Sequence, residues 1–241
     1  MKIKIAQEVF QKYPDYRRIV VIGRDLDNAE EDTALLALLK EAEAEVRQDP
    51  DLENFKEYPL IASWRKVFED MGLNPNKFPP SIANLIKRTC AGKDLPFINR
   101  LVAIFNIISL KYRIPCGGDD LGCVTGDVRL GPANGDEVFA HLGNPEAVEN
   151  PAPGEIILHD TGNGSVFCRG WCWKNGDPSK ITPQTRFVAI NLDAMPPVDG
   201  AVHRQAADEL VDLVEKHCGG KTSMKMLEPE SPCLELQTGA N

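Results

Sequence analysis

The stretch that decides the fold runs from residue 98 to residue 120 and reads INRLVAIFNIISLKYRIPCGGDD. Its first part, from about Arg100 to Tyr112, is apolar on nearly every side, which predicts a helix that is buried on most of its faces. Asn106 lies in the middle of that helix, and an unpaired buried amide costs about 1–3 kcal/mol. We therefore expect Asn106 to bond to Ser109, a neighbouring backbone, water or a ligand. A satisfied core amide and a ligand-binding amide are both open readings.

The segment after this helix carries two glycines and two carboxylates. Gly117 and Gly118 permit unusual backbone angles or the close approach of a ligand. Asp119 and Asp120 are neighbours in sequence, so their side chains can diverge, and we expect at least one of them to cap a turn. Asp119 is a candidate to receive an amino group or to orient a water molecule, with a plain polar turn as the alternative.

A second unusual stretch, residues 167–173, reads FCRGWCW. In a strand, Phe167, Arg169, Trp171 and Trp173 would share one face of the sheet. An arginine between aromatic rings is a candidate platform for stacking a nucleic-acid base. The alternative is that the aromatic stripe belongs to the core or packs against a helix.

Around these stretches, the sequence places helices first and strands later, which predicts an α+β fold with a mixed or antiparallel sheet flanked by helices. The expected order is a buried strand at 17–23, helices at about 28–47, 64–71, 81–91 and 100–112, strands at 127–130, 137–140, 155–159, 165–173 and 186–192, and a helix at about 201–218.

Residues 1–220 are expected to form a single domain, because a chain of 241 residues can bury one full-sized core. Residues 221–241 hold prolines and polar residues without periodicity, so we expect an irregular or disordered tail. No apolar run reaches the roughly 18 residues that a membrane span needs. The first residues, MKIKIAQE, lack the apolar segment of a signal peptide. We therefore expect a cytoplasmic protein without a membrane partner.

The net charge of −9 argues against a large nucleic-acid footprint, because proteins that grip phosphates usually present a basic face. A site for a terminal nucleotide, an amino acid or a small amine is compatible with this charge. The seven cysteines and four histidines have no zinc-like spacing, so we expect no metal, no cofactor and reduced, half-buried thiols. No phosphate-binding loop, dinucleotide fingerprint or nucleophile elbow is present.

These segments resemble the B3/B4 domain of the phenylalanyl-tRNA synthetase β-chain. Residues 98–120 run without a gap beside a family stretch close to INNVVDxTNYVMLExGQPxHAFD. The chain is similar above all to the free-standing members, which share SWR at 63–65, NKFPPS at 76–81, GGxDL at 117–121 and CRxWxW at 168–173. The resemblance covers about residues 15–218 and implies a B3/B4-like fold.

The resemblance also implies editing, in which a second site hydrolyses a wrongly attached amino acid from the 3′ end of tRNA. By position, Asn106 matches an asparagine of the family's editing pocket, and Pro115 matches the proline of the following loop. The family histidine falls on Gly117, and the editing glutamate maps near Ser179 and Lys180, so both polar groups are missing here. The predicted catalytic residues are Asn106 and Asp119, and the predicted substrate-binding residues are Pro115, Gly117, Gly118, Arg169, Trp171 and Trp173.

We therefore predict a free-standing deacylase of aminoacyl-tRNA or a related aminoacyl ester, which does not aminoacylate tRNA on its own. The two missing polar groups and the acidic charge keep a second prediction open, namely a non-catalytic protein that binds an amino acid or a small amine. A third prediction, an RNA-binding module without catalysis, is the least favoured by the charge. The expected partner is the 3′ end of aminoacyl-tRNA or a small amino-acid-like ligand.

Overall fold

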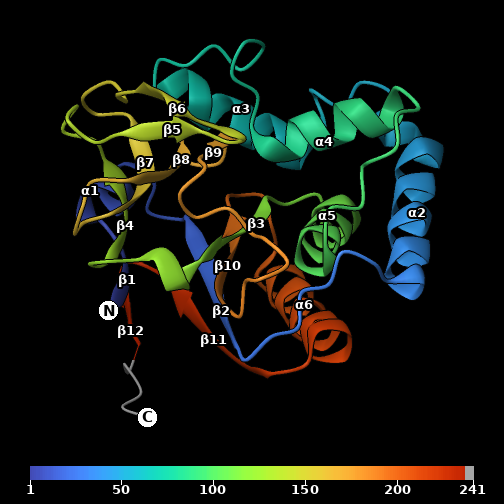
Figure 1. The fold of residues 1–241 in the computed structure, drawn as a ribbon. Coiled ribbons are helices and arrows are strands. Elements are labelled where there is room, and N and C mark those ends of the chain that lie inside the picture. The colour runs from blue at the N-terminus through green and yellow to red at the C-terminus, as the bar shows by residue number, and fades with distance from the viewer. Residues whose placement is uncertain (237–241) are drawn as a thin grey trace.

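The structure, a computed structural model, describes residues 1–236 and confirms an α+β fold in which helices pack around two main sheets (Figure 1). The helices are α1 (Gln7–Lys12), α2 (Thr33–Gln48), α3 (Pro59–Asp70), α4 (Ser81–Cys90), α5 (Arg100–Tyr112) and α6 (Gly200–Cys218), with short 3-10 helices at Pro50–Leu52 and Leu121–Cys123. Within residues 1–236, none of these helices combines the length and the apolar character needed to cross a membrane.

A six-stranded and a four-stranded sheet carry most of the strands. The strands are β1 (Lys2–Ile5), β2 (Arg17–Arg24), β3 (Cys116–Asp120), β4 (Val128–Pro132), β5 (Phe139–His141), β6 (Asn144–Glu149), β7 (Ile156–Asp160), β8 (Val166–Arg169), β9 (Lys174–Asn175), β10 (Phe187–Ala194), β11 (Lys221–Leu227) and β12 (Cys233–Glu235). The six-stranded sheet has the order β12-β1-β4-β7-β8-β9 and is mixed, because β1 and β4 are parallel. The four-stranded sheet, β11-β2-β10-β3, is antiparallel throughout. The strands β5 and β6 form a separate hairpin.

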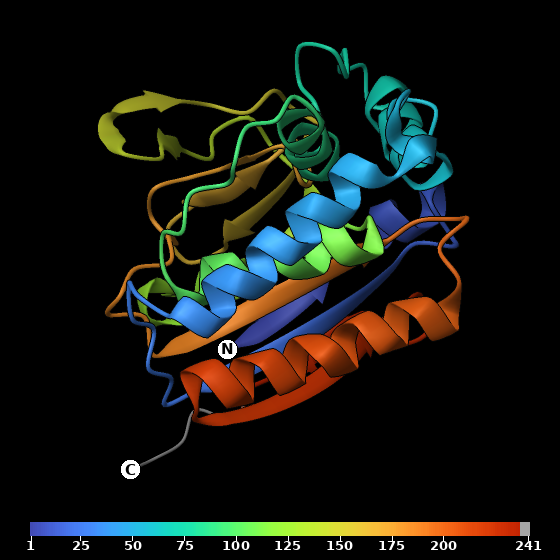
Figure 2. The same ribbon diagram turned by 90° about the vertical axis from the view of Figure 1, so that its right-hand side faces the viewer.

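One face of the four-stranded sheet is covered by α5 and α6, and α2 packs on the outer side of α5 (Figure 2). The helix predicted at 100–112 is confirmed as α5, and the side chain of Asn99 caps it by accepting a 3.0 Å hydrogen bond from Val102 N. Asn106 itself is only half-buried, on the same side of α5 as Val102. The expectation of a buried amide was therefore wrong, because this side of the helix reaches solvent.

The stretch from Ser165 to Trp173 is not one strand, so the prediction of a shared aromatic face was wrong. The strand β8 ends at Arg169, and the backbone then turns through Gly170 (φ 55°) and Trp171 (φ 67°) before β9 begins. Two left-handed residues in a row break the alternation of a strand. As a result, Trp171 turns into the core, where it is 1% exposed.

The segment after α6 was predicted to be an irregular tail, and this is wrong for the part that the structure describes. Residues Lys221–Leu227 form β11, which pairs with β2 over seven positions, and Cys233–Glu235 form β12, which pairs with β1. Both β1 and β2 would otherwise present unpaired backbone groups along one edge, and pairing satisfies them. Residues 237–241 lie outside the described residues.

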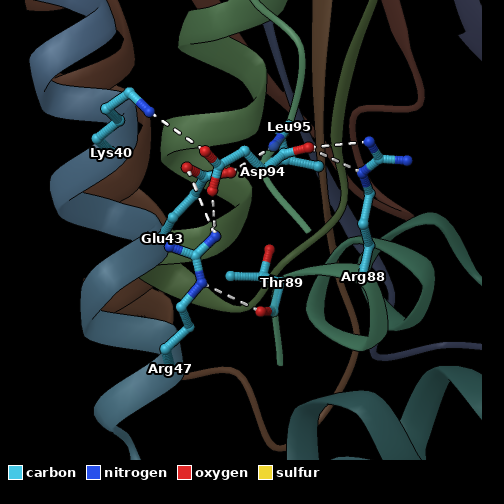
Figure 3. A network of polar contacts seen from close by, with 7 residues as sticks. All are labelled: Lys40, Glu43, Arg47, Arg88, Thr89, Asp94 and Leu95. Carbon is cyan, nitrogen blue, oxygen red and sulfur yellow. Dashed lines mark hydrogen bonds and ion pairs between the residues drawn. The ribbon is translucent and has the colours of Figure 1, made fainter. Parts of the chain in front are cut away.

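A group of polar side chains ties α2 to α4 and to the segment after α4 (Figure 3). This helix cluster consists of Lys40, Glu43 and Arg47 on α2, Arg88 on α4 and Asp94 beyond it. Arg47 Nη2 lies 2.6 Å from Asp94, and Arg47 Nε donates to the Thr89 carbonyl at 3.3 Å. The buried Glu43 carboxylate accepts a hydrogen bond from Leu95 N, and Arg88 bonds to the Asp94 carbonyl. Every charged group in the helix cluster therefore has a partner.

Candidate functional site

The two glycines of β3 lie on opposite faces of the four-stranded sheet and have different surroundings. A Cβ at Gly118 would lie 2.7 Å from Phe105 Cζ, so Gly118 lets β3 pack closely on α5. A Cβ at Gly117 would meet no atom of residues 1–236 within 4 Å. Because neighbouring strand residues alternate between faces, Gly117 points away from α5. The absence of a side chain at Gly117 therefore leaves open space on the face that is turned toward the six-stranded sheet.

That space belongs to a cavity of about 70 Å³ between the two sheets. The four-stranded sheet lines it with Arg18, Asn191, Asp193 and residues 115–119, the six-stranded side with Leu158, Cys168, Trp171, Cys172 and Asn175, and α4 with Ser81. Arg18 and Asp193 are 2% and 4% exposed, so they form its floor. Asn175 is exposed, and Ser81 and Gly117 are half-buried, so these residues form its mouth.

A buried ion pair forms the floor of the cavity. Arg18 holds Asp193 with two hydrogen bonds, from Nε to Oδ1 at 2.6 Å and from Nη2 to Oδ2 at 3.0 Å. The Tyr16 hydroxyl also donates to Asp193 Oδ1, and Trp171 Nε1 donates to the Tyr16 oxygen at 3.3 Å. Burial raises the pKa of Tyr16 well above its ordinary value, so its hydroxyl stays protonated and keeps donating. The floor is thus charged, paired and held in place by aromatic side chains.

Asp119 stands above this floor and is the most perturbed carboxyl group of the site. Ser179 Oγ donates to its Oδ1 at 2.7 Å, and Asn191 Nδ2 lies 3.3 Å from its Oδ2. Burial, assisted by the negative charge of Asp193, raises the pKa of Asp119 to about 6. A carboxyl group with this pKa changes its charge close to neutral pH, which is the property that a general base needs.

Arg18, Asp119, Ser179, Asn191 and Asp193 are named the cavity cluster, and this cluster is not fully paired. In the part of the chain that the structure describes, Arg18 Nη1 and Asn191 Oδ1 are buried without a hydrogen-bond partner. One of these atoms is a donor and the other is an acceptor. Buried polar groups without partners are uncommon, and a bound ligand or water is a usual reason for them. A ligand or water molecule that carries both an acceptor and a donor would satisfy both atoms.

Three cysteines also line the cavity, but their thiols are not suited to nucleophilic attack. Burial raises the pKa values of Cys116, Cys168 and Cys172 far above the ordinary value for a thiol. They are therefore protonated at neutral pH, and the thiolate is the form that attacks. Among the described residues, no cluster of three or more histidine, cysteine or acidic side chains has the arrangement that holds a metal ion.

The structure brings five of the sequence-predicted site residues to this cavity: Pro115, Gly117, Gly118, Asp119 and Trp171. Asp119 and Asp120 diverge, as expected: the Asp120 side chain accepts from Gly122 N at 2.8 Å and from Thr185 Oγ1 at 2.6 Å, and it caps the 3-10 helix that follows.

The other three predicted residues lie elsewhere. Arg169 is held by Glu155 through two hydrogen bonds of 2.9 and 2.7 Å and by Glu149 at 2.7 Å. Trp173 packs edge-on against Phe78, with ring centroids 4.7 Å apart. Asn106, on α5, is not among the residues that line the cavity.

Sequence reasoning missed Arg18, Asn191 and Asp193, and it named Ser179 only as a position near the family's editing glutamate. The strand β10 reads FVAINLDA, in which the two polar residues sit two positions apart within an apolar run. In a buried strand, this spacing places both polar side chains on one face, where they need partners. That pattern was the available signal for a polar site at the centre of the sheet.

The chain has matches among protein families and solved structures. A family model described as B3/4 domain matches residues 63–219. The chain belongs to the B3/4 domain family. A solved structure similar to this B3/4 domain protein is the N-terminal fragment of the phenylalanyl-tRNA synthetase β-subunit from Pyrococcus horikoshii, with 12% sequence identity and a TM-score of 0.44. The alignment covers 91% of this chain and 49% of that fragment, so the chain spans about half of its length. A comparison with curated proteins found no match.

Proposed function

We propose that the cavity binds the acyl group of an aminoacyl ester and that the protein hydrolyses this ester, with the 3′ end of aminoacyl-tRNA as the substrate. The observation that carries the proposal is Asp119, a buried carboxyl group with a pKa of about 6 that stands beside the open space at Gly117. Membership of the B3/4 domain family supports a substrate related to tRNA. The net charge of −9 fits contact with the terminal nucleotide alone.

In the proposed reaction, ionised Asp119 takes a proton from a water molecule as the water oxygen attacks the ester carbonyl. The bond between the carbonyl carbon and the ribose oxygen then breaks. The ribose oxygen takes the proton from Asp119, and the amino acid leaves as a carboxylate after its new carboxyl group loses a proton to water. Ser179 positions Asp119 through its 2.7 Å hydrogen bond. General-base catalysis of this kind contributes about 10²–10⁴-fold to a rate.

Asn191 is the residue that we propose for the amino group of the substrate. Its Nδ2 already bonds to Asp119, while its Oδ1 is buried without a partner within residues 1–236. An α-ammonium group donates hydrogen bonds and carries positive charge, so it suits an amide oxygen next to a carboxylate. The same pairing supports a second candidate function, the binding of a free amino acid without catalysis, because it requires no positioned water.

The experiment that tests the proposed function is hydrolysis of a panel of correctly charged and mischarged tRNAs by the purified protein. We expect release of the amino acid from at least one of them. Asp119→Asn should lower kcat by about 10²–10⁴-fold because it removes the base. The matched control is Asp120→Asn, which changes the neighbouring carboxyl group outside the cavity and should stay within a few fold of the unaltered protein. An Asp119→Asn variant with full activity would exclude Asp119 as the base.

A third variant, Asn106→Ala, tests the assignment that comes from the family resemblance. Asn106 is half-buried on α5, so its replacement should leave the protein folded. A loss of activity with normal thermal stability would place Asn106 at the substrate. Unchanged activity would remove it from the site. If no tRNA in the panel is hydrolysed, calorimetry with free amino acids tests the binding function.

A further inference from the structure

We propose that the cavity selects a small side chain that carries a hydroxyl group, so that serine and threonine are its preferred acyl groups and aromatic amino acids are excluded. This inference rests on the proposed function for the hydrolytic step, whereas the selection itself is also measurable by binding. Three features carry it: the volume of the cavity, the stiffness of its walls and the unpaired donor at its floor.

The volume of the cavity favours a small side chain. The cavity measures about 70 Å³, whereas an interior cavity of about 150 Å³ is the size that accommodates benzene. A water molecule occupies about 30 Å³ of liquid volume, so the cavity is small, and the side chain is the part of the acyl group that it encloses while the ester carbonyl stays at the mouth beside Gly117. Serine and threonine side chains suit this small cavity, and the rings of phenylalanine and tyrosine do not fit.

The walls of the cavity are too well packed to widen easily. Trp171 is 1% exposed and meets Tyr16 and Trp64 edge-on, with ring centroids 4.7 and 5.5 Å apart. On the opposite wall, Gly118 is pressed against the Phe105 ring. Enlarging the cavity would separate these contacts, and close-packed interiors resist such changes. The small volume is therefore a property of the fold around it.

The floor of the cavity prefers a hydroxyl group over an apolar group of the same size. Arg18 uses Nε and Nη2 to hold Asp193, and Nη1 is the guanidinium nitrogen that lacks a partner within residues 1–236. A side-chain hydroxyl oxygen can accept a hydrogen bond from Nη1. A carboxylate side chain is disfavoured, because Asp193 already neutralises Arg18 and Asp119 lies close by. A methyl group in place of the hydroxyl would leave the buried donor unpaired.

Gly117 determines how much space remains at the mouth of the cavity. A Cβ there would meet no described atom within 4 Å, and its backbone is not in the left-handed region, so alanine fits without strain. Gly117→Ala places a methyl group in the mouth of the cavity and should reduce the use of threonine more than that of serine. One methylene group in a fitted pocket typically changes specificity by about 10–200-fold.

The test compares seryl, threonyl, valyl, tyrosyl and phenylalanyl esters of one tRNA with the full-length protein. We expect release from the seryl and threonyl esters, valyl release at least about tenfold slower than threonyl release, and no release from the aromatic esters above background. Threonine and valine have the same shape, so their ratio isolates the hydroxyl. Gly117→Ala should lower the threonyl-to-seryl ratio by about tenfold or more.

The outcomes separate this inference from the proposed function. Aromatic release as fast as seryl release, abolished by Asp119→Asn, would overturn the size selection and leave the proposed function standing. Equal release of threonine and valine would overturn the role of the Arg18 donor. If no ester is hydrolysed, calorimetry is carried out with free serine, threonine, valine and tyrosine. Binding of serine and threonine alone would support the selection without catalysis. Binding of none of the four would overturn both proposals.

Discussion

The helix cluster and the cavity cluster are both groups of charged and polar side chains, but they differ in burial and in completeness. In the helix cluster, Asp94 is 57% exposed, Arg47 is 32% exposed, and every charged group has a partner. The Thr89 hydroxyl is the one polar side-chain atom there that is buried without a partner within residues 1–236. In the cavity cluster, Arg18 and Asp193 are almost fully buried, and two polar atoms have no partner among the residues that the structure describes.

This difference separates a structural role from a binding role. A cluster whose charges are satisfied by its own members holds helices together and has nothing left to offer a ligand. A buried cluster with an unused donor and an unused acceptor has an energetic cost that a ligand can relieve. The local charge alone does not distinguish the two clusters, because both contain arginine and aspartate. Within residues 1–236, the unpaired guanidinium nitrogen of Arg18 and the unpaired amide oxygen of Asn191 do.

The largest effect is expected when the ion pair of the cavity cluster is broken. Asp193→Asn removes the charge that balances the buried Arg18 guanidinium, and such a loss costs about 3–5 kcal/mol of unfolding free energy. Asp94→Asn in the helix cluster should have a much smaller effect, because solvent screens exposed pairs. Urea denaturation measures both values. Similar costs for the two variants would contradict the distinction between the clusters.

A smaller effect is expected from the titration of Asp119. Its pKa is raised by burial to about 6, above the value of an unfolded aspartate. Its stabilising contribution is therefore fully present below about pH 4 and is lost as the pH rises through about 6, by on the order of 2–3 kcal/mol. Asp119→Asn should remove this part of the pH dependence. The measurement is the unfolding free energy of both proteins between pH 4 and pH 7.5.

The helix cluster supplies the opposite case as a control. Hydrogen bonds from Arg47 and Lys40 lower the pKa of Asp94, so its contribution is present above the unfolded pKa and is lost as the pH falls through the lowered value. Asp94→Asn should therefore leave the pH dependence of the unfolding free energy between pH 4 and pH 7.5 almost unchanged. If Asp119→Asn also leaves this pH dependence unchanged, Asp119 does not have a raised pKa.

The smallest expected effect is the difference in unfolding free energy between alanine substitutions at the two glycines of β3. Gly118→Ala would push a methyl group against the Phe105 ring, and we expect a loss of about 1–2 kcal/mol, since the ring edge can shift slightly. Gly117→Ala enters open space and should change the unfolding free energy by less than about 0.5 kcal/mol. Thermal unfolding of both variants tests this pair. An equal loss for both would mean that the space at Gly117 is filled.

Local patterns were sufficient to predict several parts of this molecule. The apolar run around Ile104 predicted α5, the β-branched run around Val20 predicted β2, and the order of segments predicted the α+β class. Asp119 and Gly117 were selected because a carboxylate beside glycines is unusual in scaffold. These predictions depend on residues that are close together in the chain, and such patterns are visible in a single sequence.

The rest depends on contacts between distant parts of the chain. Arg18 and Asp193 are 175 residues apart, and they meet only because β2 and β10 pair in one register. Ser179 reaches Asp119 across 60 residues. The turn at Trp171 has a left-handed backbone, which a tryptophan rarely adopts, and the indole is held there by its contacts with Tyr16 and Trp64. No local pattern contains this information.

The pairing of β11 with β2 and of β12 with β1 has a consequence for how the protein folds while it is being synthesised. One segment, residues 221–235, completes an edge of each sheet, and the walls of the cavity belong to these two sheets. On the ribosome, this segment emerges after every residue that lines the cavity. A nascent chain that stops before residue 221 would hold all the cavity residues and still expose the edges of β1 and β2, which are templates for misassembly.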